Sequence, residues 1–468
     1  MSQINRIDGG LIDQEKVLNF TFNGQILKGY EGDTLASALL ANNKHLIGRS
    51  FKYHRPRGIV TAGSEEPNAI MEIGNGAYRE PNTRATVTQL YNGLEANSQN
   101  HRGPLSFDFM AITDFLSPLL GAGFYYKTFM WPKAFWEKFY EPAIRKSAGL
   151  GTLSTEADPD TYDKGFRHCD ILIIGAGATG LSAALTAAES GAKIILADED
   201  FLMGGRLNSE TNEIDGIAGS EWAKKTVAKL GAMENVTLMS DTTVFGAYDH
   251  GIYGAIENRA SEAREDNDKP RQVNWRIYTK RAILCAGATE RLIAFGNNDR
   301  PGIMLASAVR TYLNRFAVAT GQRISVYTNN DDGWKTAKDL NAKGFRVAAV
   351  IDSRSISPVM RVPGAEICMG TDVVDTKGRR ALKSIQLSNG KSIDTDTLAV
   401  SGGWNPNLHF TCHHRGVPKW NEEIASFVPD SSPPVGMSVA GRAKGTMVLA
   451  DAIIEGHNQG SSVAADLG

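Results

Sequence analysis

The chain has 468 residues, 42% of them apolar, so it is too long for one hydrophobic core and we expect about three domains. Fifty basic and 52 acidic residues leave a formal charge of -2. The chain therefore has no overall positive electrostatic potential that would attract nucleic acid or an anionic membrane. The four cysteines, Cys169, Cys285, Cys368 and Cys412, form no CxxC pair, which argues against zinc, an iron–sulfur cluster or a disulfide framework and suits a reduced cytoplasm.

No basic-then-apolar stretch with a small-residue cleavage site opens the chain, so no secretion signal is expected. The most apolar region, residues 107–136, is interrupted by Asp114, Pro118, Lys127 and Pro132 before the ~20 apolar residues of a membrane span accumulate. The sequence therefore predicts a cytoplasmic protein without membrane contact.

Residues 17–28 alternate in polarity around the turn Asn23–Gly24, and a helical pattern follows over 35–42. A hairpin followed by a helix is typical of a β-grasp domain, which we place at 1–95 and which has no cysteine for an iron–sulfur cluster. Its basic and aromatic loop 48–58 favours a docking or substrate-channel surface over nucleic acid, because the chain as a whole is nearly neutral.

Residues 96–165 are predicted to form a helical connector rich in aromatic side chains. Such a short segment cannot hide all of them internally, which favours an interdomain or intersubunit surface, with packing inside the chain as the alternative. The aromatic residues concerned are Phe124, Tyr125, Tyr126, Phe129, Trp131, Phe135, Trp136, Phe139 and Tyr140.

The pattern at residues 169–198 is that of a strand, a glycine turn, a helix, a second strand and an acid, which predicts a dinucleotide site in a domain formed by 166–315 and 398–468. Gly175 allows the tight turn, Gly177 lets the backbone approach a pyrophosphate and Gly180 lets helix and strand pack closely. The candidate cofactor-binding residues are Gly175, Ala176, Gly177, Ala178, Thr179, Gly180, Asp198, Glu199, Gly205, Arg206, Val244, Ala286, Gly287 and Gly441.

A second nucleotide-fold pattern is inserted at 316–397 and ends in Asp352. Its turn, residues 328–333, has one glycine and two carboxylates where a pyrophosphate needs open N–H groups, so we expect no dinucleotide there. Together the elements predict an α/β, two-dinucleotide-binding-domain oxidoreductase fold of the disulfide-reductase type, preceded by the cluster-free, ferredoxin-like β-grasp domain.

The late segment 438–445 has the shape of the turn in which flavin-dependent disulfide reductases carry an aspartate that binds the ribityl chain. Arg442 stands in the place of that aspartate, which favours NAD over FAD because NAD has no ribityl chain. Asp198 and Glu199 disfavour a 2′-phosphate, so NAD is also favoured over NADP. FAD stays open as the alternative.

No catalytic residue is assigned from the sequence. The pair His413–His414 beside Cys412 has no further ligand at a zinc spacing, so no metal is expected. Cys285 lies in an apolar run and is interpreted as a small buried residue.

Several loop segments resemble the alpha-subunit family of heterotetrameric sarcosine oxidases: residues 48–58, 63–69, 80–84, 123–132 and 197–201. The fold alone does not require these particular loop residues, so the likeness is specific to the family. It covers essentially the whole chain. The resemblance implies NAD in this subunit, FAD on a beta subunit, FMN at the interface between them, and smaller gamma and delta subunits. It further implies oxidative demethylation of sarcosine to glycine, formation of hydrogen peroxide and one-carbon transfer to tetrahydrofolate.

Members of that family extend well beyond this length into a folate-binding region similar to aminomethyltransferases. The chain is therefore expected to correspond to the N-terminal half, as a fragment, a naturally split subunit or a shorter relation. Two alternatives remain open: an FAD-dependent amine or opine dehydrogenase subunit, and a non-catalytic assembly subunit that a nucleotide stabilises.

Overall fold

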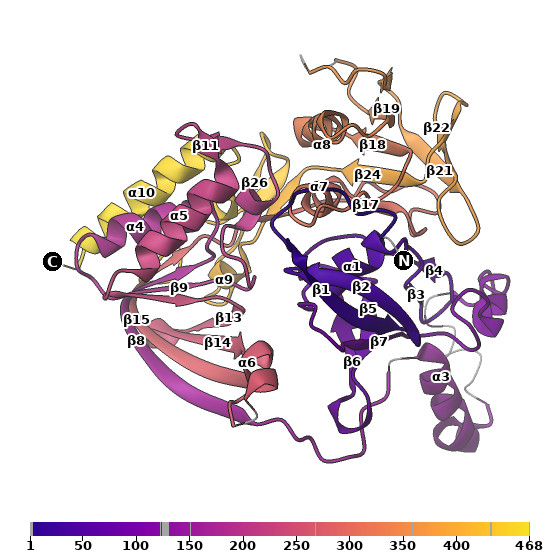
Figure 1. Cartoon of the computed structure of the whole chain (residues 1–468), viewed down its shortest axis with the longest axis horizontal. Coiled ribbons are helices and arrows are strands. Elements are labelled where there is room, and N and C mark those ends of the chain that lie inside the picture. Colours follow the sequence, from indigo (N-terminus) through magenta and orange to yellow (C-terminus); the bar gives the residue numbers. More distant parts are fainter. Residues whose placement is uncertain are drawn as a thin grey trace. The chain divides into compact units, whose positions relative to one another are not determined.

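The computed structural model describes residues 3–121, 123, 131–149, 151–266, 268–356, 360–430 and 433–467 (Figure 1). The chain divides into two compact units. The first combines Met1–Asp158 with Leu292–Gly402, and the second combines Pro159–Arg291 with Gly403–Gly468.

The first unit opens with a five-stranded sheet in the order β2-β1-β7-β5-β6. The predicted hairpin and helix are present, and Thr34 caps the buried helix α1 by accepting a hydrogen bond from the Ser37 amide. The sheet extends to Ser98, three residues past the expected boundary, because β7 pairs with β1 and β5. The elements are β1 Asp13–Phe22, β2 Gln25–Glu31, α1 Leu35–Ala41, β3 Gly48–Arg49, β4 Pro56–Arg57, β5 Ile70–Ile73, η1 Gly76–Tyr78, β6 Glu80–Arg84 and β7 Glu95–Ser98.

The connector contains the short helices η2 Phe109–Asp114, η3 Lys133–Phe135 and η4 Trp136–Tyr140, followed by α3 Glu141–Ala148. Four of the aromatic residues expected at a docking surface, Phe124, Tyr125, Tyr126 and Phe129, lie outside the described residues. In the described part, Phe115, Leu119 and Trp131 are 89%, 76% and 83% exposed. Apolar side chains of this segment therefore face outward.

The first unit also holds a parallel sheet in the order β17-β24-β18-β19-β20, with helices α7 and α8. This sheet extends beyond the expected limits 316–397 of the second nucleotide fold. It begins with β17, before residue 316, and it includes β24, which pairs with both β17 and β18 and ends after residue 397. The elements are β17 Ile303–Leu305, α7 Ala306–Asn314, β18 Ile324–Thr328, α8 Asp331–Ala342, β19 Val347–Asp352, β20 Glu366–Met369, β21 Val373–Lys377, β22 Ser384–Leu387, β23 Ser392–Asp394 and β24 Thr397–Ser401.

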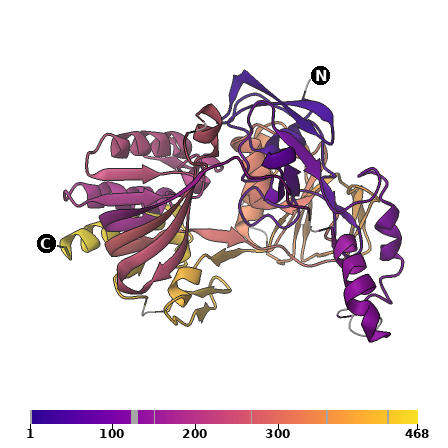
Figure 2. The ribbon, with the colours of Figure 1, turned by 90° about the horizontal axis from the view of Figure 1, so that it is seen from below.

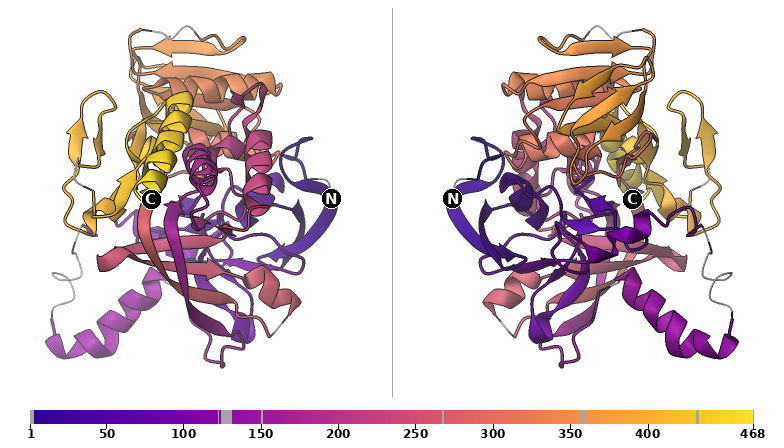
Figure 3. Two further views of the ribbon diagram at one scale, coloured as in Figure 1. Left: turned by 90° about the vertical axis from the view of Figure 1, so that its left-hand side faces the viewer. Right: turned by 90° about the vertical axis from the view of Figure 1, so that its right-hand side faces the viewer.

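The second unit is built on a sheet in the order β12-β9-β8-β15-β14-β13, with β28 paired to β15. Helix α10, which leads to the C-terminus in Figure 2, lies beside α4 (Figure 3). Gly456 and Gly460 permit this approach, since a Cβ atom there would lie 2.3 Å from Thr179 O and 2.4 Å from Ala183 O. The main elements are β8 Tyr162–Ile174, α4 Ala178–Ala188, β9 Ile194–Ala197, α5 Gly219–Gly231, β12 Val236–Met239, β13 Thr242–Tyr248, β14 Ile252–Asn258, β15 Gln272–Leu284, β28 Met437–Val439 and α10 Leu449–Ala465.

Smaller elements of this unit complete the chain. The short helix α6 Ala260–Glu265 lies between β14 and β15, which pair as an antiparallel hairpin. The others are η5 Gly205–Asn208, β10 Glu213–Ile214, β11 Ile217–Ala218, η6 Asp249–Gly251, β16 Ala288–Glu290, β25 Trp404–Pro406, α9 His409–Cys412, β26 Lys419–Asn421, β27 Ser426–Val428 and η7 Gly441–Ala443. Among the residues the structure describes, no helix has the length and apolar character to cross a membrane.

Candidate dinucleotide site

The glycine turn joins the carboxyl end of β8 to α4. Gly175 has φ +99° and a Cβ atom there would lie 2.5 Å from Cys285 O, while a Cβ atom on Gly180 would lie 1.8 Å from Gly175 O. Both glycines are therefore required by the packing of the protein itself. Gly177 differs, because a Cβ atom there would meet nothing within 4 Å. The open space beside it, at the first turn of a helix whose amides lack intrahelical partners, suits a pyrophosphate.

The order of strands places the predicted residues in a row. The ends of β9, β8, β15 and β28 are neighbours, and Asp198, the glycine turn, Ala286–Gly287 and Gly441 follow them in that order. Gly287 has φ +70° and, like Gly177, open space at its Cβ position. For an extended ligand with its pyrophosphate at the glycine turn, the prediction places one half over β9 and the other over β15 and β28.

Two further predicted glycines border the turn directly. A Cβ atom on Gly205 would lie 3.0 Å from Gly177 Cα, and one on Gly441 would lie 2.3 Å from Thr179 Oγ1. Val244 is buried in β13, in the apolar cluster that includes Ile174 and Ala197. The predicted contact of Val244 with the cofactor stays a prediction.

Asp198 is tied to the glycine turn. Its Oδ2 atom accepts the Ala176 amide at 2.5 Å and its Oδ1 atom accepts the Asp200 amide at 2.9 Å. Burial raises the pKa of Asp198 to about 6, although both backbone hydrogen bonds act in the opposite direction. The neighbouring Glu199 is exposed.

A cluster of four side chains, Arg206, Glu210, Trp404 and Arg442, lies where the second half of the ligand is expected. Arg206 Nε donates to Glu210 Oε1 at 2.5 Å, and Arg442 Nη1 is 3.8 Å from the same oxygen. The guanidinium carbons of Arg206 and Arg442 lie 4.3 and 5.0 Å from the ring centroid of Trp404. Each arginine follows a glycine that borders the turn, so this cation–π cluster adjoins the site.

Glu210 and Trp404 were missed in the sequence. Neither belongs to a spacing motif, and Trp404 reaches the cluster only because β25 pairs with β16, the strand that follows Gly287. Asn407 reinforces that connection, since its side chain donates to Ala286 O and its amide to Gly287 O.

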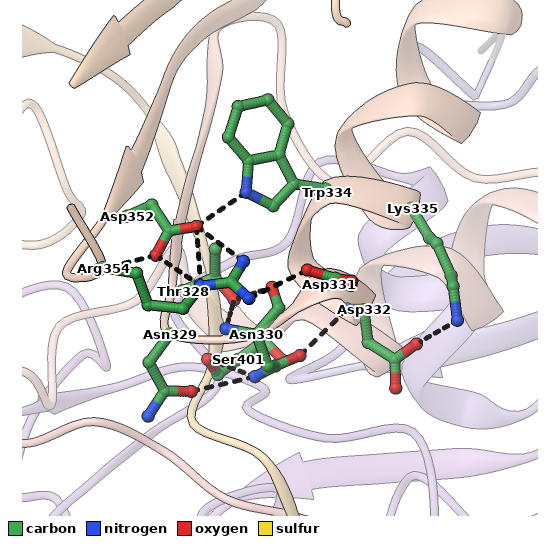
Figure 4. Close-up of polar contacts among 10 residues, drawn as sticks. All are labelled: Thr328, Asn329, Asn330, Asp331, Asp332, Trp334, Lys335, Asp352, Arg354 and Ser401. Carbon is green, nitrogen blue, oxygen red and sulfur yellow. Dashed lines mark hydrogen bonds and ion pairs between the residues drawn. The ribbon is translucent and has the colours of Figure 1, made fainter. Parts of the chain in front are cut away.

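The second nucleotide fold has a different turn (Figure 4). The buried carboxylate of Asp352 accepts Trp334 Nε1 at 2.8 Å and Arg354 Nη2 at 2.8 Å, and Arg354 Nη1 pairs with Asp331 at 2.9 Å. The Asn330 side chain caps α8 by accepting the Asp332 amide at 2.9 Å. The acid and the helix start are thus engaged by the protein's own groups.

The basic loop 48–58 is also engaged within its unit. Arg49 donates to Leu105 O and His54 O, and Arg55 and Arg57 both pair with Asp299. At the other candidate cluster, His413 Nδ1 accepts the Ala247 amide at 3.2 Å. Within the described part of the chain, no three His, Cys, Asp or Glu side chains gather as metal ligands would.

Two family models match parts of the chain. Residues 170–276 match the FAD dependent oxidoreductase family, and residues 15–101 match the 2Fe-2S iron-sulfur cluster binding domain. The first cysteine of the chain is Cys169, so the matched N-terminal domain lacks the thiolates that hold such a cluster. These matches confirm the predicted order of a ferredoxin-like domain followed by a dinucleotide-binding oxidoreductase fold.

A solved structure shares this architecture. L-proline dehydrogenase from P. horikoshii aligns with a TM-score of 0.69 and 18% identity, over 100% of this chain and 76% of its own. At this identity the likeness concerns the fold alone.

The most informative relatives are sarcosine oxidase alpha subunits. That of Rhizobium meliloti (strain 1021) is 49% identical over 463 residues, which is 98% of this chain and 47% of the relative. That of Corynebacterium sp. (strain P-1) is 34% identical over 98% of this chain and 44% of its own length. The predicted resemblance is thereby confirmed: over nearly its whole length the chain is homologous to sarcosine oxidase alpha subunits, and it spans about half of theirs.

Proposed function

We propose that this chain is the NAD-binding, alpha-type subunit of a heteromeric sarcosine oxidase. In that role it supports oxidative demethylation of sarcosine to glycine, with hydrogen peroxide formation and one-carbon transfer to tetrahydrofolate. The observation that carries this proposal is the 49% identity to a sarcosine oxidase alpha subunit over 98% of the chain. The open dinucleotide site of the second unit supports it.

The choice of NAD rests on the far half of the site. The match to FAD dependent oxidoreductases ends at residue 276, so it covers the glycine turn and Asp198, which NAD and FAD sites share, and leaves out Gly287, Trp404 and Arg442. In the sequence Arg442 stands where a flavin site offers an aspartate to the ribityl chain, and its contacts with Glu210 and Trp404 support the choice of NAD. Bound NAD supplies a nicotinamide ring that accepts or donates a hydride.

We assign oxidation of the amine to a beta-type partner that carries FAD, with FMN at its interface with this chain and with gamma- and delta-type subunits completing the complex. The carboxylates beside the site are engaged: Asp198 by two backbone amides and Glu210 by Arg206 and Arg442. We therefore assign no general base to this chain.

The exposed apolar side chains of the connector supply a surface for that partner. Phe115, Leu119 and Trp131 are more exposed than apolar residues usually are. Replacing Phe115 and Leu119 together by serine is expected to weaken recovery of the partner with this chain and to leave its nucleotide content unchanged. Undiminished recovery would remove the connector from the interface.

The decisive experiment is identification of the nucleotide released when the purified chain is denatured. We expect NAD, a colourless protein, and no sarcosine-dependent peroxide until the partner subunits are added. A yellow protein that releases FAD would support the amine or opine dehydrogenase alternative. Release of no nucleotide would contradict the proposed site.

A second measurement separates a redox role from a structural one. In the reconstituted complex, the near-ultraviolet absorbance of reduced nicotinamide is followed after addition of dithionite and then of sarcosine. An absorbance that never responds would favour the assembly subunit that a nucleotide only stabilises.

A further inference from the structure

Residues 60–69 of the N-terminal domain wrap around a buried carboxylate. Glu66 is only 2% exposed, and its side chain accepts five hydrogen bonds. Its Oε2 atom accepts the Val60 amide at 3.0 Å, the Thr61 amide at 2.7 Å and the Thr61 hydroxyl at 3.1 Å. Its Oε1 atom accepts the Asn68 amide at 2.8 Å and the Ala69 amide at 2.9 Å.

This arrangement is a loop organised around a negative charge. Donors from both ends of the loop converge on one group, and charge-assisted hydrogen bonds of this kind compensate the cost of burying a carboxylate. The neighbouring Glu65 is exposed and takes no part in these five bonds. The loop conformation therefore depends on Glu66 in particular.

The residues that meet at this carboxylate have the sequence spacing of iron–sulfur ligands. Plant-type [2Fe–2S] sites take three thiolates from C-x4-C-x2-C, and a fourth from elsewhere in the chain. Thr61, Glu66 and Ala69 have that spacing, and they lie within the region that matches the 2Fe-2S binding domain. Hydrogen bonds bring all three together, as described above.

A fourth small residue reaches the loop from outside it. Thr86 is buried, and its hydroxyl donates to Gly63 O at 2.7 Å. The adjacent Ala85 amide donates to Ala69 O at 2.8 Å, which fixes this segment against the end of the loop.

We infer that residues 60–69 are a cluster-binding loop in which the Glu66 carboxylate has replaced the cluster, with Thr61, Glu66, Ala69 and Thr86 at the four former ligand positions. Together with its four thiolate ligands, a [2Fe–2S] cluster carries a net negative charge, and its sulfur atoms accept hydrogen bonds from the surrounding protein. The carboxylate offers the same amides a negative acceptor without iron. The domain thus keeps the loop of a cluster-binding domain without its cluster, and this inference does not depend on the nucleotide proposed for the second unit.

The first test is Glu66→Gln with Glu65→Gln as the matched control. The side-chain amide introduced by Glu66→Gln would turn its N–H donors toward backbone donors, so amide exchange in a peptide covering 60–69 is expected to accelerate by about tenfold or more. Glu65→Gln should leave the exchange rate unchanged. Unaltered protection in Glu66→Gln would overturn the role of the carboxylate.

The second test rebuilds the site in the full chain with Thr61→Cys, Glu66→Cys, Ala69→Cys and Thr86→Cys together. After anaerobic treatment with ferrous iron and sulfide followed by desalting, this variant is expected to retain iron and sulfide in equal amounts and to absorb visible light. The wild-type chain, treated identically, should retain neither. A variant with native far-ultraviolet circular dichroism that holds no more iron than the wild type would overturn the assignment of the four positions.

Discussion

The two nucleotide folds of this chain follow the same order of strand, turn, helix, strand and acid, yet their glycine turns differ in the space they leave beside the backbone. In the first, a Cβ atom on Gly177 would meet nothing within 4 Å, and Asp198 is bonded to the turn's own backbone. In the second, the single glycine of the turn, Gly333, is used for packing, because a Cβ atom there would lie 2.4 Å from Thr328 Cβ.

The acids at the ends of the second strands show the difference most clearly. Asp352 is fully buried and holds Trp334 and Arg354, so it closes its turn from within. Among the described residues, the recorded hydrogen-bond partners of the Asp198 side chain are the backbone amides of Ala176 and Asp200, and none of them is a cation. A nucleotide fold by itself indicates a scaffold, so the binding function has to be argued from the residues of each turn.

The largest expected effect comes from removing the acid of the closed turn. Asp352→Ala leaves Trp334 Nε1 without an acceptor and Arg354 without its buried partner, so we expect a loss of about 3 kcal/mol in the stability of the first unit. The control Asp331→Ala removes a half-exposed partner and should cost about 0.5 kcal/mol. Chemical denaturation measures both, and nucleotide content should not change. Loss of nucleotide in Asp352→Ala would mean that the second fold binds after all.

The next effect concerns the open turn. Gly177→Ala introduces a methyl group into empty space, so the fold should persist while the pyrophosphate is kept away, and we expect nucleotide affinity to fall by about a hundredfold or ~2.7 kcal/mol. Gly231→Ala, at an exposed position in α5 where the new atom makes only ordinary contacts, is the matched control. Calorimetric titration of the nucleotide-free proteins checks the result. Unchanged affinity in Gly177→Ala would place the nucleotide elsewhere.

A smaller effect tests the far half of the open site. Arg442→Asp removes a cation beside Trp404 and sets a second carboxylate near Glu210, so we expect the preference for NAD over FAD to drop by roughly tenfold. The exposed Arg276→Asp in the same unit controls for the change in net charge. Competition binding with both nucleotides is the measurement. A preference that does not move would separate cofactor choice from Arg442.

The smallest effect is a dependence on pH. Burial raises the pKa of Asp198 to about 6. A ribose hydroxyl that donates a hydrogen bond to this carboxyl group stabilises its ionised form, so bound ribose lowers the pKa. Affinity for NAD should therefore increase with pH up to about 6, by at most about tenfold per unit, and level off above it. Asp198→Asn should bind more weakly with no such slope. A wild-type profile that is flat between about pH 5 and 7 would contradict the role of Asp198.

The sequence by itself determined the elements that depend on neighbours along the chain. The hairpin at Asn23–Gly24, the glycine turn after β8 and the strand–turn–helix order at β18 and α8 were all predicted, because spacing and residue type act locally. The relation to sarcosine oxidase alpha subunits was also predicted, from loop segments that no fold requires.

Only the tertiary structure decided which distant residues meet. Strand order placed β24 between β17 and β18 and so moved the domain limits, and the pairing of β25 with β16 brought Trp404 to Arg206 and Arg442. The role of Glu66 could not be predicted for the same reason. In the sequence it is one of many acidic residues, and only the folded loop brings five hydrogen-bond donors to its carboxylate. Contacts across a sheet depend on long-range pairing, which local patterns leave open.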